Sequence, residues 1–172
     1  MRLRARVTTQ EGFGLVELLM AMVMLNIGIL ALVAAFQSGA FALQRASKIS
    51  TASAIADIQM ERYRALKYDY VMLDTTALSS AQGNAVYTGD TAYSATQVTG
   101  TCPTAGAEEC QAMRTLTGPD GKNYRIDTYI VLDSVSSSRQ FKKVTIVVRD
   151  ARSLTGRPLA RIASTFDAST GS

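Results

Sequence analysis

Apolar residues follow one another almost without interruption from Phe13 to Phe36, and Glu17 is the one charged residue among them. The stretch holds 24 residues. At about 1.5 Å a residue it makes about 36 Å of helix, enough to cross a hydrocarbon core about 30 Å thick. A charge inside such a segment costs about 2.5–3.5 kcal/mol at its centre and less near an end. The pattern predicts a membrane-spanning helix whose carboxylate requires a positive partner.

A second helical pattern continues over residues 37–68, without proline. Its apolar residues recur at spacings of three and four, at Ile49, Ala52, Ala56, Met60, Tyr63 and Leu66. This spacing predicts an amphipathic half of the same helix, with its apolar face covered by a sheet. The charges of Asp57, Glu61 and Arg62 lie largely off that face and indicate solvated surface.

Alternating apolar residues predict an antiparallel sheet over residues 123–167. The three segments are Tyr124–Asp133, Phe141–Arg149 and about Leu159 to Phe166, with Ile162 and Phe166 pointing inward in the last. Such a meander can pack one face on the helix and keep the other face in water. We therefore expect an α+β fold: a long N-terminal helix packed on a small antiparallel sheet of three to five strands.

The connection between helix and sheet, residues 69–118, is rich in Thr, Ser, Ala and Gly between Asp74 and Glu109. Gln82-Gly83-Asn84 and Thr88-Gly89-Asp90 are turn signals. We expect a loop in which Ala85–Thr88 and Ala92–Val98 are two candidate short strands. Residues 69–172 then form one globular head of ordinary domain size.

Cys102 and Cys110 lie in this connection and are the two cysteines of the chain, which has no histidine. A zinc site would therefore lack ligands. In an exported domain, a disulfide closing this short loop is permitted and stabilises by about 2–3 kcal/mol. A disulfide is the expectation, and two free thiols are the alternative.

Composition points away from catalysis. The chain offers no histidine for proton transfer, no metal-ligand cluster and no phosphate-cradling glycine loop. We therefore expect no enzymatic activity, no cofactor and no metal site.

Net charge is +4 for the chain and +2 for residues 13–172, which hold 15 Lys and Arg against 13 Asp and Glu. Between Arg139 and Arg161, seven basic residues accompany one acidic residue, Asp150. This region could contact DNA phosphates or acidic surfaces of neighbouring subunits, or be a solvated sheet face. Aromatic residues are not interleaved with the bases as in a single-strand binding surface, so DNA is the minor hypothesis.

Residues 1–12 carry Arg2, Arg4 and Arg6 but no apolar core like that of a secretory signal peptide. Cleavage after Gly12 would leave the apolar segment on the mature chain and create an amine on Phe13, the positive partner that Glu17 requires. The basic leader would hold the N-terminus in the cytoplasm and place the head outside. An ordinary single-pass anchor is the alternative, but it explains neither the Gly12-Phe13 junction nor the position of Glu17.

This junction resembles the prepilin signal of type IV pilins and type II secretion pseudopilins, in which a short basic leader precedes Gly12, Phe13 and a glutamate, Glu17, as fifth mature residue. The stretch Leu25-Asn26-Ile27-Gly28-Ile29-Leu30-Ala31-Leu32 is most similar to minor pilins of the pilV type and to I-type pseudopilins. Gly14 stands where threonine is usual. The proline found within the helix of many major pilins is missing, because no proline precedes Pro103.

The resemblance implies a function in filament assembly. Prepilin peptidase would cut after Gly12 and methylate Phe13, and the Phe13 amine of one subunit would pair with Glu17 of its neighbour. The implied partners are this peptidase, other pilins or pseudopilins, an inner-membrane assembly platform and, before assembly, membrane lipid. A minor pilin of a type IV pilus is the first expectation. An I-type pseudopilin of a type II secretion system, or a DNA-uptake pseudopilus component, is the alternative. The implied location is the inner membrane and then a cell-surface filament.

Overall fold

The computed structural model describes residues 14–104, 106–136 and 139–168. Its contacts divide the chain into two units, Met1–Arg45 and Ala46–Ser172. Helix α1 (Leu15–Arg64, 50 residues) contributes to both units. The expected leader, residues 1–12, and Phe13 lie outside the described residues.

The part of α1 in the second unit packs through one face. Its buried residues recur every three or four positions, at Ala52, Ile55, Ala56, Gln59, Met60 and Tyr63, the spacing that aligns side chains on one side of a helix. The predicted face is therefore confirmed for most of its members, but Ile49 is exposed and the sheet covers less of the helix than predicted. α1 ends at Arg64, before the predicted end near Tyr68. Lys67 takes an extended backbone there and begins the short helix η1 (Tyr68–Tyr70).

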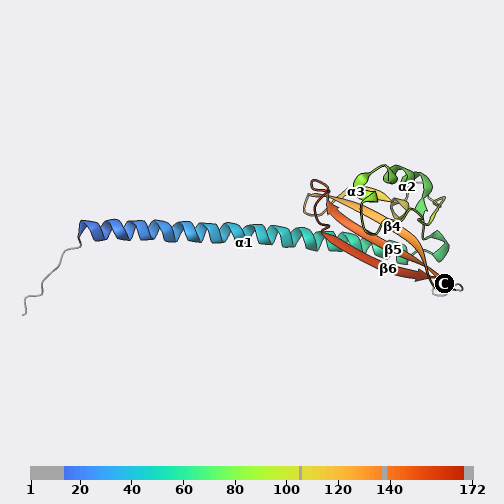
Figure 1. The fold of residues 1–172 in the computed structure, drawn as a ribbon, viewed down its shortest axis with the longest axis horizontal. Helices are drawn as coiled ribbons and strands as arrows, with labels where there is room; N and C mark the ends of the chain where they lie inside the picture. Colours follow the sequence, from blue (N-terminus) through green and yellow to red (C-terminus); the bar gives the residue numbers. More distant parts are fainter. Residues whose placement is uncertain (1–13, 105, 137–138, 169–172) are drawn as a thin grey trace, which may run out of the picture. The chain divides into compact units, whose positions relative to one another are not determined.

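Four antiparallel strands form the main sheet, in the order β3-β4-β5-β6 (Figure 1). They are β3 (Met113–Thr117), β4 (Asn123–Ser136), β5 (Arg139–Asp150) and β6 (Ala160–Asp167). The last three follow the alternating segments of the sequence, and Ile162 and Phe166 pack against the core as predicted. The α+β prediction of a long helix on a small antiparallel sheet is confirmed. Strand β3, which falls in the predicted loop, was not foreseen.

Both faces of the sheet are covered at its centre, so the prediction of one solvated face is wrong. Ile126 and Ile130 of β4 are buried in the core beside α1, and the alternate residues Arg125 and Tyr129 are buried too. Tyr129 stacks on Tyr87 with ring centroids 4.5 Å apart. The covering layer over this second face is thus supplied by residues 69–118.

This covering segment contains short elements in place of the predicted loop (Figure 1). They are β1 (Leu73–Asp74), α2 (Thr75–Gln82), α3 (Ala85–Thr88), β2 (Thr99–Gly100) and η2 (Glu108–Cys110), with β1 and β2 paired in parallel. The predicted strand Ala85–Thr88 is wrong, because the Asn84 side chain accepts hydrogen bonds from the N–H groups of Val86 and Tyr87 and starts α3 there. The predicted strand Ala92–Val98 is also wrong, since strand pairing begins only at Thr99.

Candidate functional site on the N-terminal helix

Glu17 lies in the first turn of α1. The Gly14 carbonyl accepts hydrogen bonds from the N–H groups of Glu17 and Leu18 at 3.0 and 3.1 Å. The partial positive charge at a helix N-terminus favours a carboxylate at this position by about 0.3–1 kcal/mol. The side chain is exposed, and no other charged residue occurs between Gly14 and Gln44. Gly12 and Phe13, the other predicted residues of this site, lie outside the described residues.

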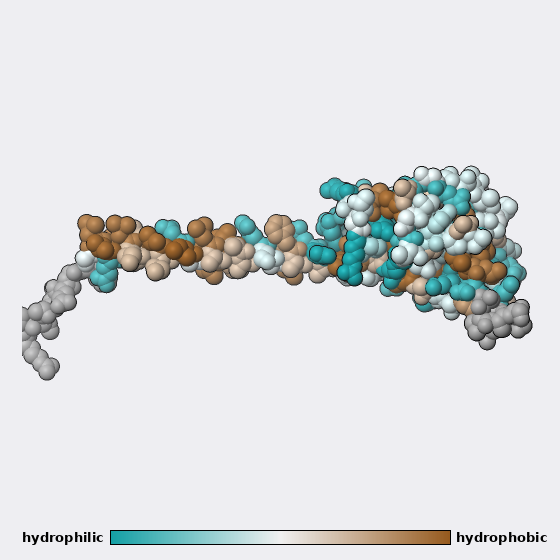
Figure 2. Space-filling model, viewed as in Figure 1, coloured by the Kyte–Doolittle hydropathy of each residue, from teal (hydrophilic) through white to brown (hydrophobic). Residues whose placement is uncertain are grey.

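Figure 2 shows apolar side chains along the visible face of the helix around Glu17, and the exposed large apolar residues include consecutive positions, which point to different sides of a helix. From Leu15 to Leu43 its large hydrophobic side chains are 46–78% exposed. Soluble domains rarely leave such a surface in water, and a helix apolar on all sides belongs in lipid or among other helices. Within the described residues, α1 is the one helix long and apolar enough to cross a membrane. Its length and composition therefore fit a single transmembrane helix.

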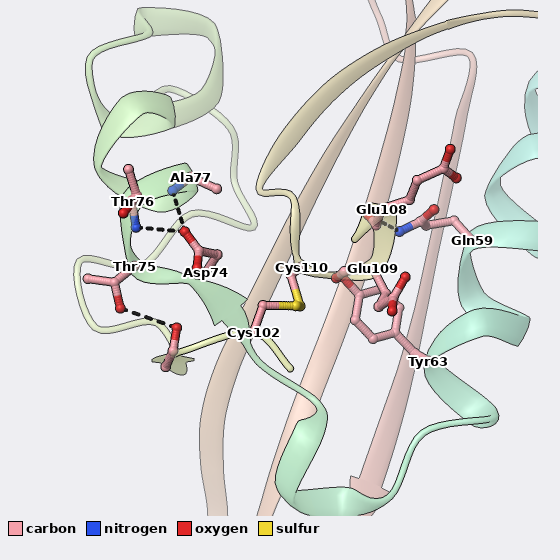
Figure 3. Close-up of a disulfide and its surroundings, with 11 residues drawn as sticks. Gln59, Tyr63, Asp74, Thr75, Thr76, Ala77, Cys102, Glu108, Glu109 and Cys110 are labelled. Atoms are coloured by element: carbon pink, nitrogen blue, oxygen red, sulfur yellow. Dashed lines mark hydrogen bonds between the residues drawn. A yellow bond between two sulfur atoms is a disulfide. The ribbon is translucent and has the colours of Figure 1, made fainter. Parts of the chain in front are cut away.

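The predicted disulfide between Cys102 and Cys110 is confirmed, with the two Cα atoms 6.2 Å apart (Figure 3). The loop that it closes contacts the buried face of α1. Gln59 Nε2 donates a hydrogen bond to the Glu108 carbonyl at 3.2 Å, and the Tyr63 hydroxyl donates to the Glu109 carbonyl. Burial raises the pKa of Tyr63, which keeps its hydroxyl protonated and able to donate. The disulfide thus holds two carbonyls against the helix.

A charged cluster is buried on the opposite face of the sheet, between β4, β5, β6 and the turn after α3. Asp90 accepts hydrogen bonds from Arg149 and, at 2.7 and 2.8 Å, from Arg161. Asp127 accepts from Arg125 Nε at 2.7 Å, and its second oxygen lies 3.6 Å from Arg149 Nε. Arg125 also donates to the Asn84 side chain at 3.1 Å, so the cluster ties both ends of α3 to the sheet.

The two carboxylates of this cluster differ in their electrostatics. Burial raises the pKa of Asp127, and Arg125 and Arg149 oppose this only in part. Burial acts on Asp90 in the same direction, but the Ala92 N–H and the two arginines outweigh it and leave the pKa of Asp90 below its ordinary value. Each carboxylate is engaged by guanidinium groups, and the described residues contain no cluster of three His, Cys, Asp or Glu that could hold a metal. The arrangement serves to fasten the covering layer.

The basic region between Arg139 and Arg161 does not form one surface. Arg149 is buried in the cluster just described. Lys142 is buried near η1, where its Nζ donates to the Tyr68 carbonyl at 2.7 Å and lies 4.3 Å from the centroid of the Tyr68 ring. Lys143, Arg152 and Arg157 remain exposed. These bases divide between the two sheet faces and a loop, which weakens the DNA hypothesis.

Sequence reasoning identified α1 and the cysteine pair but missed the charged cluster. Asp90 and Arg161 are 71 positions apart, and the packing of the covering segment on the sheet brings them together. The available signal was a pair of opposite charges, Arg125 and Asp127, two residues apart and therefore on the same side of a predicted strand. In comparisons with known proteins, no family model, no curated protein and no solved structure matches this chain.

Proposed function

We propose that this chain is a pilin-like subunit, a minor pilin that prepilin peptidase cleaves after Gly12 and that assembles through α1 into a surface filament. One observation carries the proposal. Glu17, in the first turn of α1, is the single charged residue of a helical segment that is apolar on all sides. A charge in such a segment is kept only where it has a partner, and the Gly12-Phe13 junction supplies that partner after cleavage.

Assembly then follows from two interactions of the helix. Residues 15–36 contact lipid before assembly and equivalent helices in the filament, so their apolar surface stays out of water in both states. The Glu17 carboxylate of one subunit pairs with the Phe13 amine of its neighbour. In a low-dielectric bundle this pair is favoured over leaving either charge alone, and its short range sets the axial register between subunits.

The head is compatible with export. The Cys102–Cys110 disulfide lies in the globular unit, and disulfides persist outside the reducing cytosol. An exported head with a cytoplasmic basic leader corresponds to the orientation that Arg2, Arg4 and Arg6 favour. The proposed location is therefore the inner membrane with the head outside, and later a filament.

Mass spectrometry of the N-terminal peptide tests the proposal, using the membrane fraction and sheared filaments of native cells. The expected result is a methylated Phe13 terminus in the filaments. Chain that begins at Met1 in every fraction, with none in filaments, would leave an ordinary membrane anchor. A processed chain found only with a secretion pseudopilus would favour the I-type pseudopilin.

Variants of Glu17 test the pairing. Glu17→Gln keeps the side-chain shape and removes the charge, so processing and membrane insertion should persist while filament incorporation falls about tenfold, equivalent to about 1.4 kcal/mol. Asp57→Asn, which removes an exposed carboxylate of the same helix outside residues 15–36, is the matched control and should incorporate normally. Incorporation of Glu17→Gln at the wild-type level would refute the register mechanism.

A further inference from the structure

Strand β6 forms an open edge of the main sheet. The strand order gives β6 one neighbour among the described residues, β5, and Figure 1 shows β6 at the margin of the sheet. Every residue of β6 is half-buried or exposed, whereas β5 is buried from Val144 to Arg149. The strand contains no proline and its pairing with β5 has no register shift, two features by which natural edges prevent pairing with other chains. The outer edge of β6 is therefore accessible to another strand.

Hydrogen-bond alternation shows which backbone groups of β6 face outward. In an antiparallel sheet, successive residues turn their N–H and C=O groups to opposite neighbours. The Thr128 N–H donates to the Ala112 carbonyl next to β3, so even-numbered residues of β4 face β3 and odd-numbered ones face β5. Along the register, even-numbered residues of β5 and β6 then face each other, and the Val148 carbonyl indeed accepts from the Leu159 N–H at 2.9 Å. The residues of β6 that face away from β5 include Arg161, Ala163 and Thr165.

The sequence of β6 is complementary to itself when two copies run antiparallel. Outward-facing residues must meet outward-facing residues, and the register that overlaps most of the strand places Ser164 opposite its own equivalent. Arg161 then lies opposite Asp167, so a guanidinium faces a carboxylate. Arg161 is 38% exposed and has several N–H donors. Ile162 lies opposite Phe166 on the other side of the sheet. Opposite charges and apolar pairs directly across two strands stabilise their pairing.

We propose that the globular unit pairs with a second copy of this chain through β6, in an antiparallel contact with a twofold axis at Ser164. The two main sheets then join into one continuous sheet. Hydrogen bonds between the outward N–H and C=O groups hold the strands together, as when a strand adds to a sheet edge, and a twofold contact uses the same surface on both copies. Because the paired strands run in opposite directions, this contact differs from that between neighbouring subunits of one filament, which share one direction. The inference concerns the globular unit and goes beyond the proposed function.

Cysteine cross-linking of the full chain in detergent tests this contact. At a non-hydrogen-bonded antiparallel pair, such as Ser164 with its equivalent, the Cα atoms are about 4.5 Å apart, within the range of about 4.4–6.8 Å that a disulfide spans. Ser164→Cys should therefore give a covalent dimer under mild oxidation. Trypsin cleavage after Arg161 releases residues 162–172, which contain neither Cys102 nor Cys110. Mass spectrometry can thus identify the link between the two copies of this peptide.

Matched positions test the register. Ala163→Cys and Thr165→Cys lie on either side of the proposed axis, where equivalent residues are about 7–8 Å apart diagonally across the strands. They should cross-link to their own equivalents about tenfold more slowly than Ser164→Cys, because a disulfide does not bridge such a distance without movement of the backbone. Thr117→Cys, at an exposed position of β3 on the opposite edge of the sheet, is the matched control and should be equally slow.

Proline at the outer edge tests the hydrogen bonds. Ala163→Pro removes an outward N–H and leaves the bonds between β5 and β6 in place, and edge strands accept proline at such positions. Added to Ser164→Cys, it should slow cross-linking by at least about tenfold, because each copy loses one intermolecular hydrogen bond. Ala163→Ser keeps the N–H and should cross-link at the original rate. Near-ultraviolet circular dichroism verifies that each variant is folded.

Three results would overturn the inference. Cross-linking of Ser164→Cys no faster than that of Thr117→Cys would show that β6 makes no contact with a second copy. Faster cross-linking at Ala163 or Thr165 than at Ser164 would refute the register, and this comparison decides the question even where Ala163→Pro unfolds. Cross-linking that a folded Ala163→Pro chain leaves unchanged would not depend on the strand edge. Each result leaves the proposed subunit intact, since mass spectrometry of the N-terminal peptide tests that function separately.

Discussion

Replacing Asp90 by asparagine tests how the covering layer is held on the sheet. The Asp90 side chain is 1% exposed and accepts hydrogen bonds from Arg149 and Arg161. Asparagine has nearly the same shape and keeps one accepting oxygen, so the substitution removes chiefly the charge. The result therefore reports on the ion pairs and only weakly on packing.

The magnitude follows from the surroundings of each arginine. Removing one partner of a buried ion pair costs about 3–5 kcal/mol when the other charge stays buried and unpaired. Arg149 retains the Gly156 carbonyl at 3.1 Å and Asp127 at 3.6 Å, and Arg161 is 38% exposed and can be hydrated. We therefore expect Asp90→Asn to lower the free energy of unfolding by about 2–3 kcal/mol, and Arg161→Gln to lower it by about 1 kcal/mol or less.

The effect should depend on pH in a defined direction. The pKa of Asp90 in the folded chain lies below its ordinary value of 3.8, so its ion pairs contribute fully above about pH 4 and are lost as the pH falls through the folded pKa. The difference in unfolding free energy between wild type and Asp90→Asn should thus be largest at pH 7 and shrink below pH 4. The raised pKa of Asp127 acts in the opposite direction. Because both proteins contain Asp127, its contribution largely cancels in the difference.

These differences are measured by urea unfolding of the detergent-solubilised full chain, with the near-ultraviolet circular dichroism of the tyrosines as the signal of unfolding. Tyr87 and Tyr129 stack beside the cluster and report its loss. Asp57→Asn, which changes an exposed carboxylate on α1, is the control and should have an effect below about 0.5 kcal/mol. Asp90→Asn within about 0.5 kcal/mol of wild type at pH 7, or a difference that stays constant down to pH 3, would refute the argument.

Two further predictions concern the contacts of α1 in the globular unit. Replacing both Cys102 and Cys110 by serine should lower the free energy of unfolding by about 2–3 kcal/mol. It should also speed hydrogen exchange of the adjoining α1 amides, because the loop carbonyls are then free to leave Gln59 and Tyr63. Unchanged exchange of these amides would show that the loop stays in place without its disulfide. Met60→Ala should lower the free energy of unfolding, measured in urea, by about 2–4 kcal/mol because Met60 is fully buried. Ile58→Ala, on the exposed side of the same helix, should lower it by less than about 1 kcal/mol. Equal decreases for the two variants would contradict the assigned buried face.

Elements with a regular repeat could be predicted from the sequence. Alternation in Tyr124–Asp133 and Phe141–Arg149 placed β4 and β5, and spacings of three and four placed the buried face of α1. The covering segment had no such repeat. Its helices α2 and α3 are too short for a periodic signal, and each begins at one capping side chain, Asp74 or Asn84. No local sequence pattern predicts that these helices pack on the second face of the sheet.

The sequence by itself determined the apolar segment of α1, the position of Glu17 near its start, and two cysteines close enough to pair. These are local properties, set by consecutive residues and their spacing. The tertiary structure alone decided that Asp90 meets Arg161 and that Tyr63 reaches the disulfide loop. These partners lie 71 and 46 positions apart, and contacts over such distances arise only when the antiparallel strand order and the packing of both sheet faces bring remote segments together.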